Sequence, residues 1–81
     1  MIVRVKLFAV AKERAGRDSV EIEIGPGATV RQLRGALVEQ VPPLADVIAH
    51  ARLAVNSEYA ADGMVIPAAA DVAVIPPVSG G

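Results

Sequence analysis

Residues 19–43, SVEIEIGPGATVRQLRGALVEQVPP, predict a strand, a break, a helix and a stop in immediate succession. Aliphatic and acidic side chains alternate over residues 19–24, which is typical of a half-buried strand. A Gly-Pro-Gly break follows, and Thr29 with Gln32 three positions later forms a capping box that begins a helix. Pro42-Pro43 removes backbone donors and ends that helix, so a strand is followed by one main helix.

The segments on either side of this stretch predict further strands around the same helix. Residues 2–8 alternate in one register, with Phe8 on an otherwise charged face. Residues 9–17 favour a short helix that ends at Gly16. The remaining segments that we predict are a further helical turn within 44–51, a strand over 52–56, a return strand over 58–61 and a final strand over 71–75.

This order of elements is that of a small α+β fold. Two N-terminal strands, one main helix and a C-terminal strand returning beside the first suit a ubiquitin-like β-grasp, a mixed sheet of about five strands with the helix packed across it. Periodicity alone leaves other small α+β folds open. We expect a β-grasp domain over residues 1–76 and a flexible Gly-Gly tail over residues 77–81.

The composition excludes several classes of function. The 81 residues carry a formal net charge of −1, which gives no electrostatic footprint for nucleic acid or an anionic membrane. No apolar run is long enough to cross a bilayer or to serve as a secretory signal, so we expect a cytoplasmic domain. Cysteine is absent, which removes thiolate chemistry, and we expect neither a metal site nor a cofactor bound by this chain.

Within the domain, the candidate catalytic residues have ordinary structural explanations. His50 is the only histidine, and we interpret it as an exposed residue at a loop or helix end. Glu21 and Glu23 lie two apart on the outer face of a strand, and paired carboxylates act as acid and base only in a cleft that separates their pKa values. The interior therefore supplies no catalyst.

The end of the chain, Pro76-Pro77-Val78-Ser79-Gly80-Gly81, is the remaining candidate. Consecutive prolines stiffen the exit from the last strand. The final two glycines have no Cβ, so they can enter a channel that is too narrow for other residues and leave the terminal carboxylate open to attack. The alternative is a frayed end without function. We favour a functional terminus, because it follows a compact β-grasp pattern.

The sequence resembles the family of molybdopterin synthase small subunits (molybdopterin-converting factor subunit 1), which are ubiquitin-like sulfur carriers. The resemblance spans the chain and is most evident in three segments, Lys6–Ala9 with Lys12–Gly16, Ala54–Asn56, and Asp71–Gly81. The Pro-Pro-Val-Ser-Gly-Gly ending is its most specific part, since family members carry Ser or Thr before the glycines.

The resemblance implies a cycle centred on the terminus. An ATP-dependent adenylyltransferase of the ubiquitin-activating type adenylates Gly81, and sulfur delivery gives a thiocarboxylate. The chain then donates sulfur to cyclic pyranopterin monophosphate within the large synthase subunit, in a heterotetramer whose catalytic side chains belong to that partner. In this cycle Gly81 carries the reacting atom, Gly80 gives clearance, and Ser79, Val78, Pro77 and Pro76 position the tail.

Three further residues are predicted to bind the partner. Phe8 and Ile75 share an outer face if the last strand lies beside the first, and Tyr59 joins them. Relatives often have an aromatic residue near position 75. The alternative is that the short helix over residues 9–17 covers Phe8 and Ile75 as a minor core. Alternative functions are sulfur delivery to thiamine thiazole, cysteine or tRNA, and conjugation to other proteins through Gly81.

Overall fold

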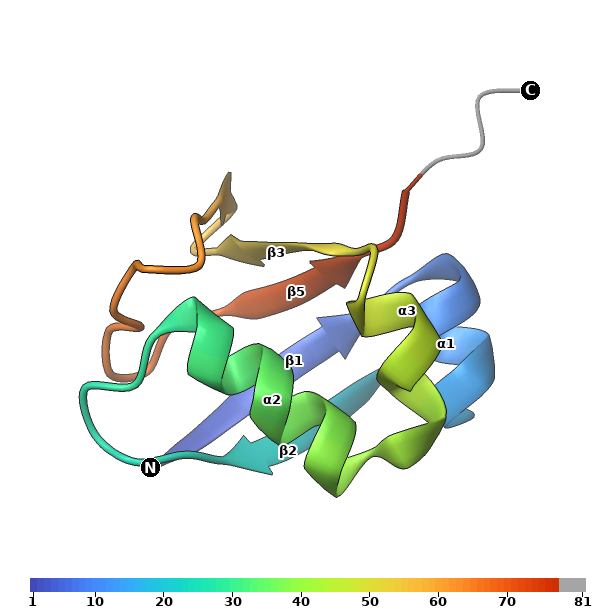
Figure 1. Cartoon of the computed structure of the whole chain (residues 1–81), viewed down its shortest axis with the longest axis horizontal. Coiled ribbons are helices and arrows are strands. Elements are labelled where there is room, and N and C mark those ends of the chain that lie inside the picture. The colour runs from blue at the N-terminus through green and yellow to red at the C-terminus, as the bar shows by residue number, and fades with distance from the viewer. Residues whose placement is uncertain (78–81) are drawn as a thin grey trace.

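The computed structural model describes residues 1–77, which form a five-stranded sheet with helices against one of its faces (Figure 1). The strands lie in the order β2-β1-β5-β3-β4. Their bounds are Ile2–Leu7 for β1, Ser19–Glu23 for β2, Arg52–Val55 for β3, Glu58–Tyr59 for β4 and Val72–Ile75 for β5. β1 pairs antiparallel with β2 and parallel with β5, so the sheet is mixed as predicted.

The short helix α1 (Ala9–Ala15) joins β1 to β2 and ends as the sequence predicts. Gly16 adopts a left-handed conformation with φ of 71°, and its N–H donates to the carbonyl of Lys12. That conformation is costly for residues with a Cβ, which explains the glycine at this position.

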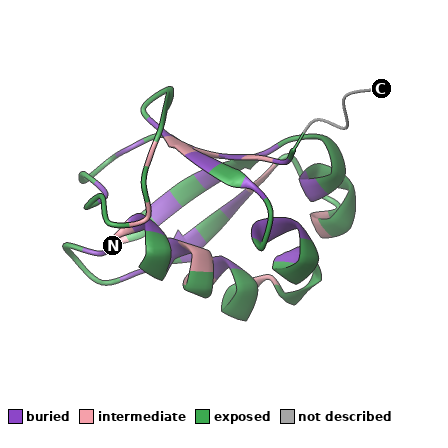
Figure 2. Cartoon of the chain, turned by 45° about the horizontal axis from the view of Figure 1, so that its top comes forward, coloured by how far each residue is buried: buried purple, intermediate pink, exposed green. Residues whose placement is uncertain are grey.

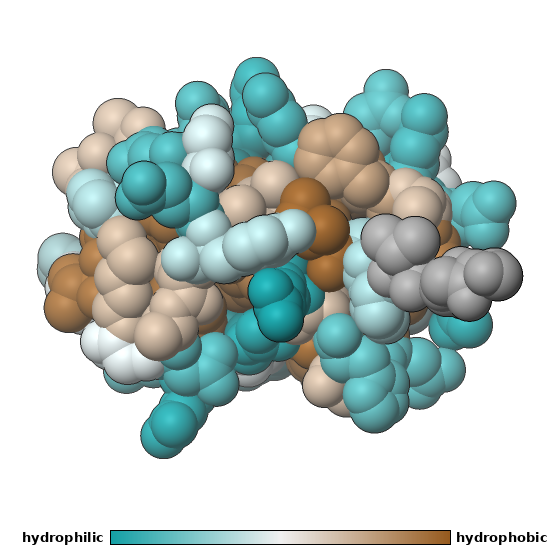
Figure 3. Space-filling view, turned by 90° about the horizontal axis from the view of Figure 1, so that it is seen from above, coloured by the Kyte–Doolittle hydropathy of each residue, from teal (hydrophilic) through white to brown (hydrophobic). Residues whose placement is uncertain are grey.

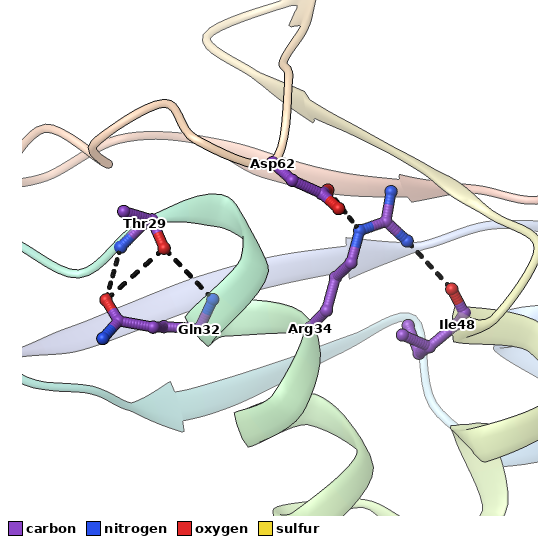
Figure 4. Close-up of polar contacts among 5 residues, drawn as sticks. All are labelled: Thr29, Gln32, Arg34, Ile48 and Asp62. Atoms are coloured by element: carbon purple, nitrogen blue, oxygen red, sulfur yellow. Dashed lines mark hydrogen bonds and ion pairs between the residues drawn. The ribbon is translucent and has the colours of Figure 1, made fainter.

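The main helix α2 (Val30–Gln40) begins at the predicted capping box. The Thr29 hydroxyl accepts a hydrogen bond from the backbone N–H of Gln32, and the Gln32 side chain accepts one from the backbone N–H of Thr29 (Figure 4). Leu33 and Leu37 are fully buried against the sheet. The helix ends just before the two prolines, which begin a short 3₁₀ turn.

The chain then turns back to the sheet through η1 (Pro42–Leu44) and α3 (Ala45–Ile48). A tight hairpin connects β3 to β4, and its two turn residues Asn56 and Ser57 both have positive φ. The backbone N–H of Asn56 donates to the carbonyl of Asp71, and the side-chain Oδ1 of Asn56 accepts from the backbone N–H of Asp71. These two hydrogen bonds fix the hairpin to the start of β5. The predicted strand over residues 58–61 covers Glu58–Tyr59.

Burial alternates along the strands, so the two faces of the sheet differ (Figure 2). On the face toward α2, aliphatic side chains of four strands form one core with the helices. No polar side chain is buried within residues 1–77. The other face carries charged and partly exposed apolar side chains, among them the predicted partner-binding residues Tyr59 and Ile75.

Candidate functional site

Strand register places one row of side chains across the outer face of the sheet. Lys6 of β1 pairs with Ala73 of β5, which pairs with Ala54 of β3, which in turn pairs with Tyr59 of β4. Ile75 follows two residues later on the same face of β5. Because the side chains of Ala73 and Ala54 are short, the surface is lower in the middle of this row than at Lys6 and Tyr59 on either side.

The row forms the floor of a groove of about 430 Å³. The side chains that line it come from β1, β5, β3 and the β3–β4 hairpin: Lys6, Phe8, Ala54, Ser57, Tyr59, Asp71, Val72, Ala73 and Ile75. In the view of Figure 3, apolar side chains near the middle of the surface lie next to hydrophilic ones, and further apolar side chains lie toward the left edge. Phe8, Tyr59 and Ile75, which the sequence predicts to share one outer face, therefore line the same groove.

Phe8 lies where β1 ends and α1 begins. Its backbone is extended, and its carbonyl accepts a hydrogen bond from the backbone N–H of Ala11. About half of its surface, 47%, is exposed. Ile75 is half-buried, and Tyr59 is 63% exposed. Helix α1 therefore covers Phe8 only in part, and about half of its surface remains available for contact with another molecule.

The chain leaves β5 at the same end of the sheet as Phe8, because β1 and β5 are parallel (Figure 1). Pro76 is buried and Pro77 is exposed. The buried ring of Pro76 offers little surface, so any role of Pro76 lies in fixing the direction of the chain. Val78, Ser79, Gly80 and Gly81 lie outside the described residues, and the roles assigned to them stay predictions.

The groove is bordered by two cations that form no ion pair within residues 1–77. These are Lys6 on β1 and Arg52 on β3, one on each side of β5. The guanidinium of Arg52 lies 5.0 Å from the centroid of the Tyr59 ring, a cation–π geometry that holds it at the edge of the groove. Arg52 also lies opposite Ile75 in the register.

Two other basic side chains near this end of the sheet, Lys12 and Arg14, are held by carboxylates. Lys12 of α1 lies 2.9 Å from Asp18, and the hydrogen bond with Asp18, reinforced by its charge, raises the pKa of Lys12 above the ordinary 10.5. Arg14 pairs with Asp46 at 3.2 Å. These cations have partners within the chain, which distinguishes them from Lys6 and Arg52.

Sequence reasoning missed Arg52 and Lys6 as members of the site. Alternation placed Lys6 on the outer face but did not show what lies beside it. The signal for Arg52 was available in the hairpin, because the turn at residues 56–57 brings the strand that contains Arg52 next to Tyr59. Its position opposite Ile75 depended on the β3–β5 pairing, which no local pattern specifies.

The other candidate residues lie outside the groove. His50 is exposed after α3, and Glu21 lies 4.0 Å from Arg4 on the exposed face of the sheet. Residues 1–77 contain no cluster of three His, Cys, Asp or Glu side chains suited to a metal ion. Nor does any helix in this part of the chain have the length and apolar character needed to cross a membrane.

Comparison with known proteins identifies the family. The sequence model of the ThiS family matches residues 5–81, which include the groove and the Gly-Gly ending. The chain belongs to the ThiS family. One relative, the molybdopterin synthase sulfur carrier subunit of Arabidopsis thaliana, is 34% identical over 79 residues, covering 98% of this chain and 82% of that protein. Small archaeal modifier protein 1 of Haloferax volcanii is 36% identical over 84 residues, covering 94% and 97%.

Solved structures of similar proteins share the fold of this ThiS-family chain. The crystal structure of small archaeal modifier protein 1 from Haloferax volcanii superposes with a TM-score of 0.87 at 35% identity, covering all of both chains. A chain from the complex of subunits 1 and 2 of molybdopterin-converting factor from Helicobacter pylori 26695 superposes at 0.70 with 18% identity, again over both full lengths, and this likeness concerns the fold alone. The predicted β-grasp fold and the resemblance to sulfur carriers are confirmed.

Proposed function

We propose that this chain is the sulfur-carrier subunit of a molybdopterin synthase and donates sulfur from its terminal glycine in molybdenum cofactor biosynthesis. Its similarity over nearly its whole length to a molybdopterin synthase sulfur carrier subunit supports this function. The observation that carries the proposal is the path of β5. This strand forms the groove floor and ends at Ile75, so the segment that continues to Gly80-Gly81 starts beside a surface suited to docking.

The proposed chemistry takes place at the terminal carboxylate of Gly81. A carboxylate oxygen attacks the α-phosphorus of ATP, and pyrophosphate leaves, which gives an acyl-adenylate. Hydrosulfide then attacks the acyl carbon and displaces AMP, which gives the thiocarboxylate; if the donor is a persulfide, its attack gives an acyl disulfide, and a thiol cleaves the S–S bond to release the thiocarboxylate and form a disulfide with the donor. That thiocarboxylate transfers its sulfur to cyclic pyranopterin monophosphate, and the addition of water restores the carboxylate.

In this scheme the chain contributes a docking surface and a reactive terminus. We assign the catalytic side chains to the large synthase subunit, as the resemblance to the family implies. The adenylyltransferase that uses ATP is a second partner, and a heterotetramer with the large subunit is the assembly we expect. Glycine at positions 80 and 81 suits both partners, because a chain without Cβ atoms fits a narrow channel.

Reconstitution tests the proposal. The chain is incubated with the adenylyltransferase, ATP and a sulfur donor, and then with the large subunit and cyclic pyranopterin monophosphate. We expect molybdopterin to form with the full chain but not with a variant that lacks Gly81. Both proteins should have the same melting temperature, because the core formed by the described residues ends at Val74, seven positions before the deletion. Molybdopterin formation by the truncated protein would refute the proposed role of the terminus.

A second candidate function is conjugation to other proteins through Gly81, and the similarity to small archaeal modifier protein 1 favours it. Both functions begin with adenylation and differ in what attacks the activated glycine. A lysine amine forms an isopeptide bond and gives a ladder of larger species in denaturing gels of cell extracts, whereas a sulfur carrier gives none. The same extracts distinguish delivery to thiazole, cysteine or tRNA, since loss of the chain would then deplete those products.

A further inference from the structure

The charges around the groove specify what kind of surface docks there. Lys6 and Arg52 have no ion-pair partner within residues 1–77, although four other basic side chains of the chain do. Strand order places β5 between them, with Ala73 and Ile75 on its outer face. An apolar strip therefore has an unpaired cation on each side. The carboxylate of Asp71 also lines the groove and forms an ion pair with neither cation.

Docking of a purely apolar surface on this strip would remove water from both cations. Such desolvation is costly unless a carboxylate replaces the lost water. The Arg52 guanidinium stacks 5.0 Å from the centroid of the Tyr59 ring, which limits how far this cation can turn away from a docked surface. The register position of Arg52 opposite Ile75 also places it beside the last residue of β5, close to where the chain continues to the glycines.

A second copy of this chain fits the groove poorly. Two copies that met face to face through this strip would bring Lys6 and Arg52 of both copies together, and the Asp71 carboxylate of each copy would balance only half of that positive charge. Like charges at an interface oppose association, so the pair acts against self-association through this apolar strip. The occupant must have apolar character in its middle and negative charge at its sides.

We infer that the docking segment of the large synthase subunit is acidic, with an apolar side chain against Phe8 and Ile75 and carboxylates facing Lys6 and Arg52. This inference rests on the proposed function, which names the large subunit as the partner. Lys6 and Arg52 would then determine specificity, because the same large subunit would reject a sulfur carrier with a different charge pattern around its groove.

Charge reversal tests the inference. The dissociation constant for the large subunit encoded in the same genome is measured by calorimetry for Lys6→Glu and for Arg52→Glu. The matched control is Arg31→Glu, an exposed arginine of α2 on the helical side of the sheet that forms no ion pair within residues 1–77 and undergoes the same change of charge. We expect each groove variant to bind about tenfold more weakly, and the control to bind within about twofold of the unchanged protein.

Two further measurements separate charge from fold. The double variant Lys6→Arg, Arg52→Lys keeps both charges, and we expect it to bind within about threefold of the unchanged protein. Added salt should weaken binding of the unchanged protein more steeply than binding of a Lys6→Glu, Arg52→Glu variant.

The outcomes distinguish this inference from the proposed function. If the unchanged protein binds the large subunit and the groove variants bind as well as Arg31→Glu does, the inference is wrong and the proposed function stands. Equal weakening by all three reversals would also overturn it, because the effect would then be one of net charge. If the unchanged protein does not bind the large subunit, or forms a dimer through this face, the proposed partner itself is wrong.

Discussion

Replacing Phe8 with alanine is expected to weaken docking by an amount that the structure defines. A phenylalanine side chain buries about 200 Å² when fully covered. With 47% of the residue exposed, about 90 Å² is available to a partner. At about 25 cal/mol per Å², covering that area contributes at most about 2.3 kcal/mol to binding, or about 40-fold in the dissociation constant.

The same substitution also affects folding, because the other half of the side chain is already covered within the domain. That half contributes at most about 2.6 kcal/mol to the free energy of unfolding, and less if the unfolded chain is compact. A domain of this size has about 4–12 kcal/mol in total. We therefore expect Phe8→Ala to be folded and somewhat less stable. The backbone contacts at the start of α1 are kept, since Phe8 caps that helix through its carbonyl only.

The assay is titration of the large synthase subunit with the Phe8→Ala protein at a temperature where urea unfolding shows it to be native. The control is Val65→Ala, which removes a side chain of a residue that is 55% exposed and lies opposite Thr29, away from the groove. We expect the Phe8 variant to bind between about 5- and 40-fold more weakly, and the control to bind like the unchanged protein. A native Phe8→Ala protein with an unchanged dissociation constant would refute the assignment of the groove as the docking surface.

Three further predictions concern stability and are all measured by urea or thermal unfolding. Leu37→Ala, at a fully buried position of α2, should lower the free energy of unfolding by about 2–5 kcal/mol, and a loss below 1 kcal/mol would contradict its place in the core. Arg34→Met should cost about 1–2 kcal/mol, because the guanidinium donates at 2.9 Å both to Asp62 and to the carbonyl of Ile48, in a partly exposed setting. An unchanged melting temperature would show that these hydrogen bonds do not stabilise the packing of α2 against Asp62 and the end of α3. Asp18→Asn should be less stable than the unchanged protein at neutral pH, because Asp18 raises the pKa of Lys12. That difference should shrink as the pH rises above 10.5 and Lys12 deprotonates, and a difference that persists there would exclude this pair as its source.

Local patterns predicted most of the fold, because each element carries its own signal. The capping box at Thr29, the left-handed glycine after α1 and the prolines after α2 all act within one helical turn, so they can be read from neighbouring residues. Alternation in the last strand also gave the correct outer face for Ala73 and Ile75. These predictions needed no knowledge of the tertiary structure.

Contacts between distant segments could not be predicted in this way. Arg34 looks like a solvated helix residue, yet it joins α2 to Asp62 in a loop and to the end of α3 (Figure 4). The side chain of Gln40 hydrogen-bonds to both the N–H and the carbonyl of Glu23, which protects part of the free edge of β2. The juxtaposition of Arg52 and Tyr59 depends likewise on pairing. In each case the partner is selected by the packing of the sheet and helices, and no sequence spacing indicates it.

The most direct test of the central claim is the intact mass of the chain after incubation with ATP, the adenylyltransferase and a sulfur donor. Replacement of one carboxylate oxygen of Gly81 by sulfur adds about 16 Da, and the change should be absent without ATP or when Gly81 is deleted. We expect this shift, followed by its disappearance when the large subunit and cyclic pyranopterin monophosphate are added. An unchanged mass, in a reaction where a known carrier of the family is converted by the same enzyme and donor, would contradict it.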